Sequence, residues 1–513
     1  MKLGAMLADC ALRFPEREAI VCEDRRISFG ELDRTANRLA NALLARGQTV
    51  GDRLVMYMPN SAELVEAMVG AAKSGALIVP VATRLAAQEV DYIVGDCEPW
   101  AVIFTPEFRE TAHAAAANAP NDPFLIAVGE ANDGEISFSA LLAEGDEATA
   151  PPLPTEFDDL VIGYTSGTTG RPKGSIATHT AIVLLGGFIN PSEWGLTAED
   201  RIIATTPMAH RTGLGRIANA VCLGCAVVIL PKFDPVACVD TIEREKITVI
   251  GLVPTIARML MAEMEKRPDA CRTLRMMVAT GEAFPVEIKQ RLAAAVPHLK
   301  LYSFYAQTEA GFIACLRPEE QLTYPTSCGR PVPGVELRIV DAERNELPVG
   351  ETGEILMRCG APGLTAMTHY WRNPEATEAA FHEGWLITGD VGRLDEHGYL
   401  YFVDRAKDMI VSGGLNIYSR EVEDALEAHA AVNEAAVLPV PDPEFGESVF
   451  AYVTFHEGKT ATEDDLIEHC RSLIASYKKP KFVRPIDVLP RNSTGKVVKV
   501  MLRESAAKET EKI

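Results

Sequence analysis

The sequence predicts a large α/β domain at the N-terminus and a small α+β domain at the C-terminus. Three observations support this fold class. Before residue 404, apolar runs alternate with helical patterns, as expected for a parallel sheet covered by helices. From about Glu421 the pattern changes to a short helix, two strands and another helix. Between these parts, the stretch DRAKDMIVSGGLN is charged and then glycine-rich, which is typical of a linker or hinge.

The first helix with a clear start signal begins at a capping box. Ser28 and Glu31 supply the S-x-x-E pattern, and Gly47 marks the end of the helix. The rest of the large domain is expected to contain strands over 54–58, 76–81, 247–253 and 274–279 and helices over 62–73 and 235–246. The small domain is expected to contain helices over 421–429 and 463–475 and strands over 434–440 and 448–455.

The composition is typical of a soluble globular protein. The chain has 513 residues, of which 47% are hydrophobic and 24% charged, so it is long enough for at least two cores. A formal charge of −22 argues against nucleic acid as a partner, because phosphate backbones require a basic face. The longest apolar run, residues 217–230, is too short for a membrane span, and the N-terminus lacks a secretory pattern. A cytoplasmic protein is therefore expected.

The eleven cysteines are expected to be reduced, buried thiols, because most occur singly in apolar surroundings. Cys222 and Cys225 have C-x-x-C spacing, but no second pair or nearby histidine completes a zinc set. We therefore predict a core strand there rather than a metal or redox site.

The stretch YTSGTTGRPKG, residues 164–174, raises the question of a phosphate site. Its glycines let backbone amides approach a ligand closely, and its hydroxyls with Arg171 and Lys173 add donors. It is not a Walker A loop, because the spacing from Gly167 to Gly170 is too short. From these residues alone, a solvated turn remains an alternative.

Four further stretches decide between these alternatives: FYAQTEAG (304–311), GWLITGD (384–390), YFVDRAKD (401–408) and PRNSTGKVVK (490–499). In this order, and together with the glycine-rich loop, they resemble the adenylate-forming superfamily of acyl-CoA synthetases, luciferases and peptide-synthetase adenylation domains. The resemblance covers essentially the whole chain. It implies that a carboxylic acid is joined to the α-phosphate of ATP with release of pyrophosphate, and that the acyl group then passes to coenzyme A. This chemistry needs positioning and charge stabilisation but no enzyme nucleophile.

The resemblance also implies residue roles on the ATP side of the site. Glu309 would bind Mg²⁺, Thr308 would face the phosphates, and Tyr305 would lie on the adenine. Asp390 would accept both ribose hydroxyls, with Arg405 beside the same ribose. The remaining ATP-binding positions are the phosphate loop, Thr165, Ser166, Gly167, Thr168, Thr169, Gly170 and Lys173, and the base-pocket segment, Gly281, Glu282 and Ala283.

The same resemblance divides the chain into residues 1–404, a hinge at 405–408 that contains Lys407, and a mobile small domain at 409–513. Lys496 would reach from the small domain to bridge the substrate carboxylate and the α-phosphate during adenylation. After rotation about the hinge, Ser412, Gly413 and Gly414 would lie beside coenzyme A.

The acyl pocket is expected near the segment PMAHRTGLGR (207–216). His210 occupies the gate position and is also a candidate catalytic residue, and the other expected pocket residues are Gly213, Leu214, Ala279, Thr280 and Phe304. Small and apolar walls favour a medium-chain, aryl or other hydrophobic acid. For Arg211 and Arg216 we favour structural or surface roles over binding a second carboxylate of the substrate.

Two positions depart from the family pattern. Ala306 replaces a glycine, and Ser419 replaces a proline, which predicts a looser start to the first small-domain helix. The basic run 477–484 is compatible with binding coenzyme A phosphates and with a solvated surface. A stand-alone acyl-CoA ligase is the leading hypothesis. The alternatives are an enzyme that loads an acid onto a carrier protein and a catalytically silent nucleotide-binding protein, and whether the chain is a homo-oligomer stays open.

Overall fold

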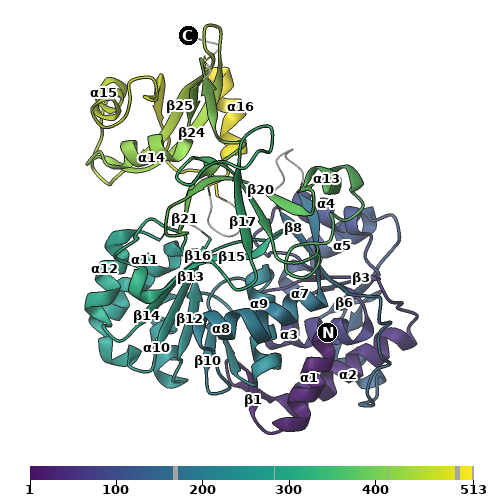
Figure 1. The fold of residues 1–513 in the computed structure, drawn as a ribbon. Helices are drawn as coiled ribbons and strands as arrows, with labels where there is room; N and C mark the ends of the chain where they lie inside the picture. Colours follow the sequence, from purple (N-terminus) through teal and green to yellow (C-terminus); the bar gives the residue numbers. More distant parts are fainter. Residues whose placement is uncertain (166–171, 282–283, 414, 492–496, 511–513) are drawn as a thin grey trace.

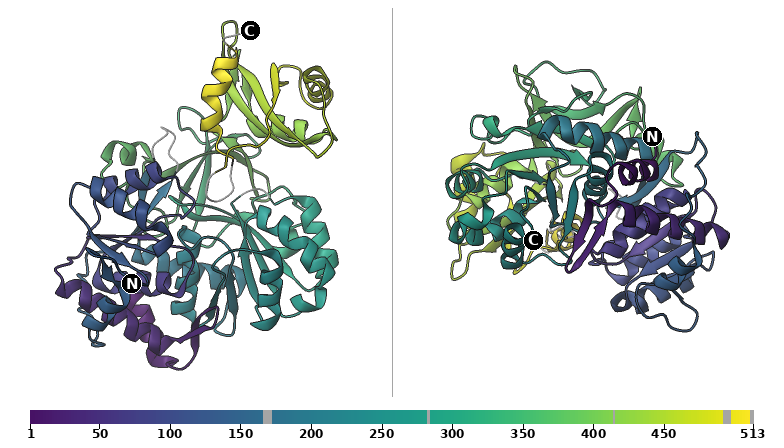
Figure 2. Two further views of the ribbon diagram at one scale, coloured as in Figure 1. Left: turned by 180° about the vertical axis from the view of Figure 1, so that it is seen from behind. Right: turned by 90° about the horizontal axis from the view of Figure 1, so that it is seen from below.

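The computed structural model describes residues 1–165, 172–281, 284–413, 415–491 and 497–510. The following predicted site residues lie outside the described residues: Ser166, Gly167, Thr168, Thr169, Gly170, Glu282, Ala283, Gly414 and Lys496. The chain forms a large N-terminal α/β domain and a smaller C-terminal domain with its own sheet, which confirms the predicted fold class. Figures 1 and 2 show the small domain at one end of the large one.

The first sheet of the large domain has seven strands in the order β7-β6-β5-β3-β4-β8-β9. Neighbouring strands are parallel except β8 and β9, which pair in antiparallel fashion. The strands are β3 (Arg53–Tyr57), β4 (Leu77–Pro80), β5 (Ala101–Phe104), β6 (Phe124–Ala127), β7 (Ile136–Ser137), β8 (Asp159–Thr165) and β9 (Lys173–Thr178). The strands predicted over 54–58 and 76–81 are therefore confirmed as β3 and β4.

The second sheet has nine strands in the order β16-β15-β14-β13-β12-β10-β11-β1-β2. Its centre, from β14 to β1, is parallel, and both edges are antiparallel. The strands are β1 (Glu18–Cys22), β2 (Arg25–Ser28), β10 (Arg201–Ala204), β11 (Ala226–Ile229), β12 (Val249–Leu252), β13 (Met276–Thr280), β14 (Lys300–Gln307), β15 (Gly311–Leu316) and β16 (Arg330–Pro331).

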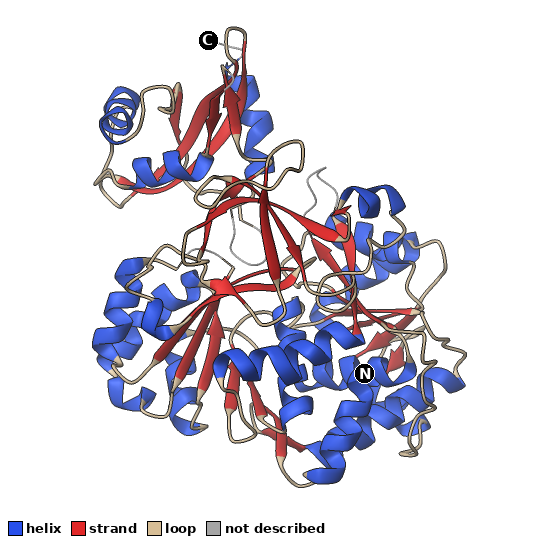
Figure 3. Cartoon of the chain, in the orientation of Figure 1, coloured by secondary structure: helices blue, strands red, loops and turns tan. Residues whose placement is uncertain are grey.

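Helices lie between these two sheets and on their outer faces (Figure 3). One core joins the sheets through Leu39 of α2, Met56 of β3 and Val227 of β11. The predicted capping box is present, since the Ser28 hydroxyl accepts from Glu31 N and the Glu31 carboxylate accepts from Ser28 N. The helices are α1 (Leu3–Arg13), α2 (Phe29–Ala45), α3 (Ala62–Ser74), α4 (Ala87–Cys97), α5 (Arg109–Asn118), α6 (Phe138–Glu144), α7 (His179–Leu184), α8 (Asn190–Trp194), α9 (Arg211–Leu223), α10 (Pro235–Arg244), α11 (Pro254–Lys266), α12 (Val286–Ala295) and α13 (Pro374–Ala379).

A third, antiparallel sheet completes the large domain, and the sequence patterns did not predict it. Its path is β17-β18-β20-β19, and β21 also pairs with β20. The strands are β17 (Glu336–Val340), β18 (Gly353–Arg358), β19 (Phe381–His382), β20 (Trp385–Leu394) and β21 (Leu400–Arg405). Figure 1 shows β17, β20 and β21 between the two large sheets and the small domain.

The small domain is a five-stranded sheet with three helices. It contains β22 (Ile410–Ser412), β23 (Leu415–Ile417), β24 (Val432–Asp442), β25 (Gly446–Phe455), β26 (Phe482–Pro485), α14 (Ser419–Glu427), α15 (Glu463–Leu473) and α16 (Lys499–Thr510). The linker predicted over 404–416 is only partly right. Residues after Met409 form the hairpin β22–β23, because Ser412 pairs with Gly446 of β25 and joins the hairpin to the sheet.

All eleven cysteines are free thiols, as predicted. Eight of them are buried, including Cys10, Cys97, Cys271 and Cys470, whereas Cys222, Cys328 and Cys359 are half-buried. The core strand predicted at Cys222 and Cys225 is only partly right. Cys222 lies in α9 and Cys225 just before β11, because Gly224 ends the helix in the left-handed conformation at φ 80°. In the described parts of the chain, no helix is long and apolar enough to cross a membrane.

Candidate active site

Strands from all three sheets of the large domain meet at the candidate site. Thr165 ends β8, Gln307 ends β14, and Asp390 lies in β20. The two large sheets approach closely there, since a Cβ on Gly163 would lie 3.0 Å from Cγ2 of Thr308. Ligand sites in α/β sheets occur at the carboxyl ends of strands, where loops leave the sheet.

Glu309 lies in the turn after β14 and accepts hydrogen bonds from two hydroxyl groups. Thr165 Oγ1 donates to Glu309 Oε1 at 3.0 Å, and Tyr370 Oη donates to the same oxygen at 3.2 Å. Burial and the Glu309 charge raise the pKa of Tyr370, which keeps the phenol a donor. The Lys173 ammonium lies 5.3 Å from the centre of the Tyr370 ring. Sequence reasoning missed Tyr370, which lies in no motif that it identified.

Asp390 is a buried carboxylate that contacts three side chains of the site, and it is only 1% exposed to solvent. Its Oδ2 accepts from Tyr305 Oη at 2.5 Å and from Gln307 Nε2 at 2.6 Å, while Arg405 Nε lies 2.8 Å from Oδ1. Burial, and then the Asp390 charge, raise the pKa of Tyr305 well above its usual value. Gln307 was also missed, although it lies two residues after Tyr305 and therefore on the same face of β14.

Arg211 at the start of α9 holds the turn that carries Thr308 and Glu309. Its guanidinium donates to the carbonyl oxygen of Thr308 and, at 2.6 Å, to that of Thr365. Burial lowers the pKa of Arg211 to about 10, although the Glu309 charge acts in the opposite direction. These contacts agree with the structural role favoured from the sequence.

His210 is the N-cap of α9 and lines a narrow, mainly apolar cavity between the two large sheets. Gly213 is required at the next turn, because a Cβ there would lie 2.3 Å from Cα of Met208. Leu214 is buried beside it. The cavity is lined by Met68, Ile78, Pro80, Val161, Gly163, Ser175, Ala177, Ile182, Met208, Ala209, His210, Arg211, Leu214 and Thr308.

The predicted acyl-pocket walls do not all lie together. Thr280 pairs with Phe304 across β13 and β14, and Phe304 stacks on Phe312 with ring centroids 4.4 Å apart. The Trp194 ring completes this aromatic cluster at 5.4 Å from Phe304. Ala279 belongs to the core on the opposite face of the sheet, because successive side chains of a strand alternate between faces. The prediction that Ala279 lines the pocket together with Thr280 and Phe304 is therefore wrong, because its side chain lies on the other face of the sheet.

The predicted hinge packs against α16. Arg503 Nη2 donates to the carbonyl oxygen of Lys407 and lies 2.8 Å from Asp408 Oδ1. Ser419 is fully buried: its hydroxyl donates to Asp404 at 3.0 Å and accepts from Lys499 Nζ at 2.6 Å. The looser helix start predicted at Ser419 is therefore wrong, because the hydroxyl makes contacts that a proline would lack.

The two motifs of the small domain lie at opposite ends of the β24–β25 hairpin. Gly413 N donates to Phe445 O at 2.8 Å, beside the turn between these strands. At the other end, Arg491 forms an ion pair with Glu434, and residues 491 and 497 form a β-bridge. The two ends are roughly 27 Å apart at about 3.4 Å per residue.

The basic run 477–484 is largely neutralised within the small domain. Lys478 Nζ lies 2.7 Å from Glu421 Oε1, and Lys481 Nζ lies 2.7 Å from Asp442 Oδ2. Arg484 pairs with Glu463. These ion pairs favour the interpretation of the run as part of the protein surface.

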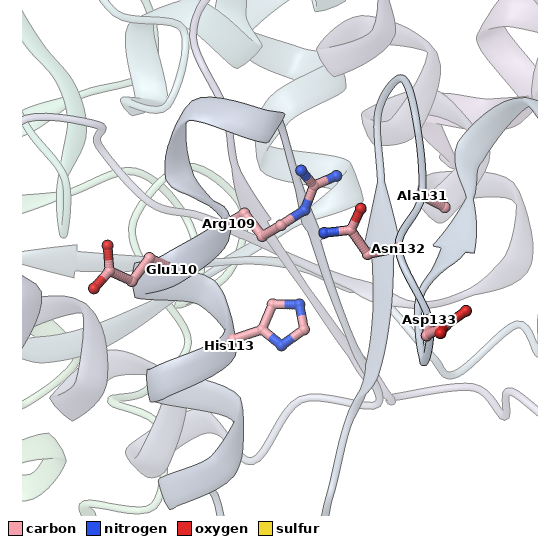
Figure 4. Close-up of a pocket in the computed structure, with 6 residues that line it drawn as sticks. All are labelled: Arg109, Glu110, His113, Ala131, Asn132 and Asp133. Atoms are coloured by element: carbon pink, nitrogen blue, oxygen red, sulfur yellow. The ribbon is translucent and has the colours of Figure 1, made fainter.

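A surface hollow of about 640 Å³ lies elsewhere on the large domain, between α5 and the loop after β6 (Figure 4). Its Arg109 and His113 both contact Glu135, at 2.8 and 2.7 Å, so their polar groups are already paired. In the seven-stranded sheet, β3 and β4 separate it from β8. The hollow is therefore not part of the candidate site.

Two family models match the chain. Residues 7–371 match the AMP-binding enzyme model, and residues 421–496 match the AMP-binding enzyme C-terminal domain model. The chain belongs to the AMP-binding enzyme family. This confirms the resemblance to adenylate-forming enzymes that the motifs indicated.

Curated relatives of the same family cover nearly the whole chain. An indoleacetate–CoA ligase from Aromatoleum aromaticum is 36% identical over 98% of this chain and 96% of its own length. A fatty acid–[acyl-carrier-protein] ligase, ScoC, from Streptomyces coeruleorubidus is 33% identical over 96% of this chain and 93% of its own length. The predicted enzyme class, an AMP-forming acid–CoA ligase, agrees with the family and with the indoleacetate–CoA ligase.

Solved structures of family members have the same architecture. ATP-bound MatB from Rhodopseudomonas palustris superimposes with a TM-score of 0.87 at 31% identity, covering 98% of this chain and 99% of that chain. The apo form of MatB, with the same identity and coverage, gives a TM-score of 0.76. The present arrangement of the chain is therefore closer to the ATP-bound form of that AMP-binding enzyme.

Proposed function

We propose that the chain joins a hydrophobic carboxylic acid to AMP, with release of pyrophosphate, and then forms a thioester with coenzyme A. The observation that carries this proposal is that Thr165 at the end of β8, Glu309 just after β14 and Asp390 within β20 come together from three sheets. Both carboxylates are held by hydroxyl, amide or guanidinium donors. A site of this kind presents acceptors for a ribose and a metal, and it opens beside a glycine-rich loop suited to phosphates.

Nucleotide binding follows from this arrangement. Asp390 accepts the ribose hydroxyls, because its carboxylate has acceptor capacity beyond the contacts with Tyr305 and Gln307. Tyr305 lies against the adenine while its hydroxyl fixes Asp390. Lys173 and Thr165 flank the phosphate loop on both sides and contribute a charge and a hydroxyl to the β- and γ-phosphates.

Glu309 fits a magnesium ion that is shared with substrate phosphates. Its hard carboxylate is oriented by Thr165 and Tyr370 at the end of β8, next to the loop. Among the described residues, no group of three histidine, cysteine or acidic side chains is placed to hold a metal, which agrees with one carboxylate assisted by phosphates and water. The ion would neutralise charge on the phosphates during adenylation.

Adenylation requires charge stabilisation rather than a protein nucleophile. A carboxylate oxygen of the acid attacks the α-phosphorus, and the bond to pyrophosphate breaks. Lys496, which lies outside the described residues, is assigned the cation that bridges the two anions. The described residues beside it support this assignment, since the bridge between residues 491 and 497 lies at one end of the β24–β25 hairpin, whereas Ser412 and Gly413 lie at the other.

Thioester formation is assigned to a second orientation of the small domain. The thiol sulfur attacks the acyl carbon, the bond to AMP breaks, and the thiol proton leaves to solvent. Only one end of the β24–β25 hairpin can face the large domain at a time, so rotation at 405–408 exchanges Lys496 for Ser412–Gly414. The proposed domains remain 1–404 and 409–513, with His210 as the gate at the acyl pocket.

A carrier protein is the alternative to coenzyme A as the acceptor of the acyl group. Loading onto a carrier protein is supported by the relative ScoC, which is named a ligase of that type. ScoC aligns with 96% of this chain, as the CoA ligases do with similar coverage, so the protein must be tested with both acceptors. A catalytically silent nucleotide-binding protein is the remaining alternative.

The test follows pyrophosphate, AMP and thioester with ATP, Mg²⁺ and a panel of fatty, aryl and dicarboxylic acids, with coenzyme A present or omitted. We expect acid-dependent pyrophosphate release and a thioester only with coenzyme A. Lys496→Ala should reduce pyrophosphate release by about 10²–10³-fold, because a cation at the point of attack is lost. Pyrophosphate without thioester would indicate a carrier protein, and unchanged adenylation by the variant would contradict the role of Lys496.

A further inference from the structure

Arg216 lies on α9, five residues after Arg211, and faces the nine-stranded sheet. Only 6% of its surface is exposed, so it is not a surface residue. Its guanidinium occupies the space above Gly251 of β12, where a Cβ would lie 1.4 Å from Nη2 of Arg216. The absence of a side chain at residue 251 therefore makes room for this buried charge.

The charge of Arg216 has no partner among the residues that the structure describes. Arg216 forms no hydrogen bond and no ion pair with any residue that the structure describes. Burial lowers the pKa of its guanidinium to about 10, so the group is still charged at neutral pH. A desolvated charge without a counterion is unfavourable, and buried arginines are normally paired. A group from outside the chain would complete this site.

The guanidinium lies on the same face of the sheet as Thr280 and Phe304, two of the residues predicted to line the acyl pocket. Gly251 pairs with Val278 of β13, and Thr280 pairs with Phe304 of β14. Residues two apart in a strand share a face, so Gly251, Val278, Thr280 and Phe304 all face the same side of the sheet. Arg216 therefore lies about 7 Å from the pair formed by Thr280 and Phe304, measured along the strands and away from their carboxyl ends.

We propose that Arg216 binds a second carboxylate at the far end of the substrate, so that the enzyme activates dicarboxylic acids with an apolar middle. A guanidinium matches a carboxylate with two parallel hydrogen bonds, which gives both charge neutralisation and direction. The aromatic cluster of Trp194, Phe304 and Phe312 provides apolar contacts on the same face of the sheet. This assignment rests on the proposed acid-activating function and names its substrate class. It replaces the structural or surface role favoured for Arg216 from the sequence.

The first experiment compares acids matched in carbon number: glutarate with pentanoate, adipate with hexanoate, and suberate with octanoate. Pyrophosphate release is measured with the full-length protein, ATP and Mg²⁺. We expect kcat/KM to be higher for the best dicarboxylate than for its matched monocarboxylate by about 10²–10³-fold, the effect of one buried charge pair. Preference for the monocarboxylate in every pair would overturn the proposal.

Variants identify the residue responsible for this preference. Arg216→Met keeps the side-chain length and should remove the preference for dicarboxylates, while monocarboxylates gain activity. Arg216→Lys retains a cation and should restore part of the dicarboxylate activity. Arg291→Met is the matched control, because Arg291 of α12 forms an exposed ion pair with Glu265 of α11, and the variant should behave as the wild type.

Thermal unfolding separates substrate binding from a structural role. Arg216→Met should unfold at the same temperature as the wild type or higher, since it removes a buried charge that forms no hydrogen bond or ion pair with a described residue. A fall of several degrees, with unchanged acid preference, would assign Arg216 to the structure and overturn the proposal.

Failure of the proposed function gives a different result. If the wild type is active on monocarboxylates and Arg216→Met does not change that activity, the Arg216 assignment fails while the proposed function stands. If no acid supports pyrophosphate release, the proposed function fails, and calorimetric titration with glutarate, adipate and suberate then decides the Arg216 assignment. Binding that is weakened by Arg216→Met supports the assignment, whereas equal or absent binding overturns it.

Discussion

Arg211 and Arg216 lie on the same helix, and both are largely buried, but their surroundings differ. Arg211 donates to the carbonyl oxygens of Thr308 and Thr365, so its charge is used within the protein. Arg216 has a glycine beneath it and no partner among the described residues. The first arginine helps to assemble the site, whereas the second is complete only when a ligand supplies an anion.

The same difference separates the two halves of the site. On the nucleotide side, Asp390 is held by Tyr305, Gln307 and Arg405 before any ligand binds. On the proposed acid side, aromatic rings pack together, and the Arg216 guanidinium has no partner among the described residues. Under the proposed function, the residues for the reaction are therefore held in place before a ligand binds, whereas the choice of acid depends on a few contacts particular to this chain.

The largest effect is expected from Arg211→Met. This variant leaves two carbonyl oxygens without their donor, so the free energy of unfolding should fall by about 2–3 kcal/mol. Displacement of Thr308 and Glu309 should reduce kcat/KM by about 10²-fold, equally for mono- and dicarboxylates. Denaturant unfolding and pyrophosphate release measure both effects. Loss confined to dicarboxylates would mean that Arg211 binds the acid instead.

Gly251→Ala tests the acid side without removing a charge. The added methyl group would displace the guanidinium of Arg216, which is the end of a flexible side chain, so stability should change little. Dicarboxylate kcat/KM should fall about tenfold, which corresponds to about 1.4 kcal/mol, and monocarboxylates should be unaffected. Unchanged kinetics with both acids would show that the position of Arg216 above Gly251 is unimportant.

A smaller effect is expected from Tyr305→Phe on the nucleotide side. The variant removes one hydrogen bond to Asp390, while Gln307 and Arg405 still hold the carboxylate. KM for ATP should rise about threefold to tenfold, since one hydrogen bond contributes about 1 kcal/mol. The ratio between dicarboxylate and monocarboxylate activity should not change. Steady-state kinetics with varied ATP checks both, and a changed acid ratio would contradict the separation of the two halves.

Sequence patterns predicted the parallel sheets well, because their strands are apolar runs between helices with clear start signals, such as α2 at Ser28. They missed the antiparallel sheet of β17–β21, where polar and apolar residues mix. They also missed the β22–β23 hairpin, whose three-residue strands are held by β25, a strand far along the chain. Such pairing is a tertiary contact that local composition does not encode.

Site residues within motifs were found because their order along the chain is specific. Tyr370 and Gln307 were missed because their roles arise from contacts with Glu309 and Asp390 in three dimensions. Ala279 was placed on the wrong face, since a motif gives position but not the alternation of side chains. The setting of Arg216 was not predictable either, because it depends on the packing of α9 against Gly251.

The most direct test measures the ratio of kcat/KM for adipate to that for hexanoate in the wild type, Arg211→Met and Arg216→Met. We predict a high ratio in the wild type and the same ratio in Arg211→Met, even though that variant is slower with both acids. In Arg216→Met the ratio should fall to one or below. A low ratio in the wild type, or an equal fall in both variants, would contradict the assignment of one arginine to the assembled site and the other to the substrate.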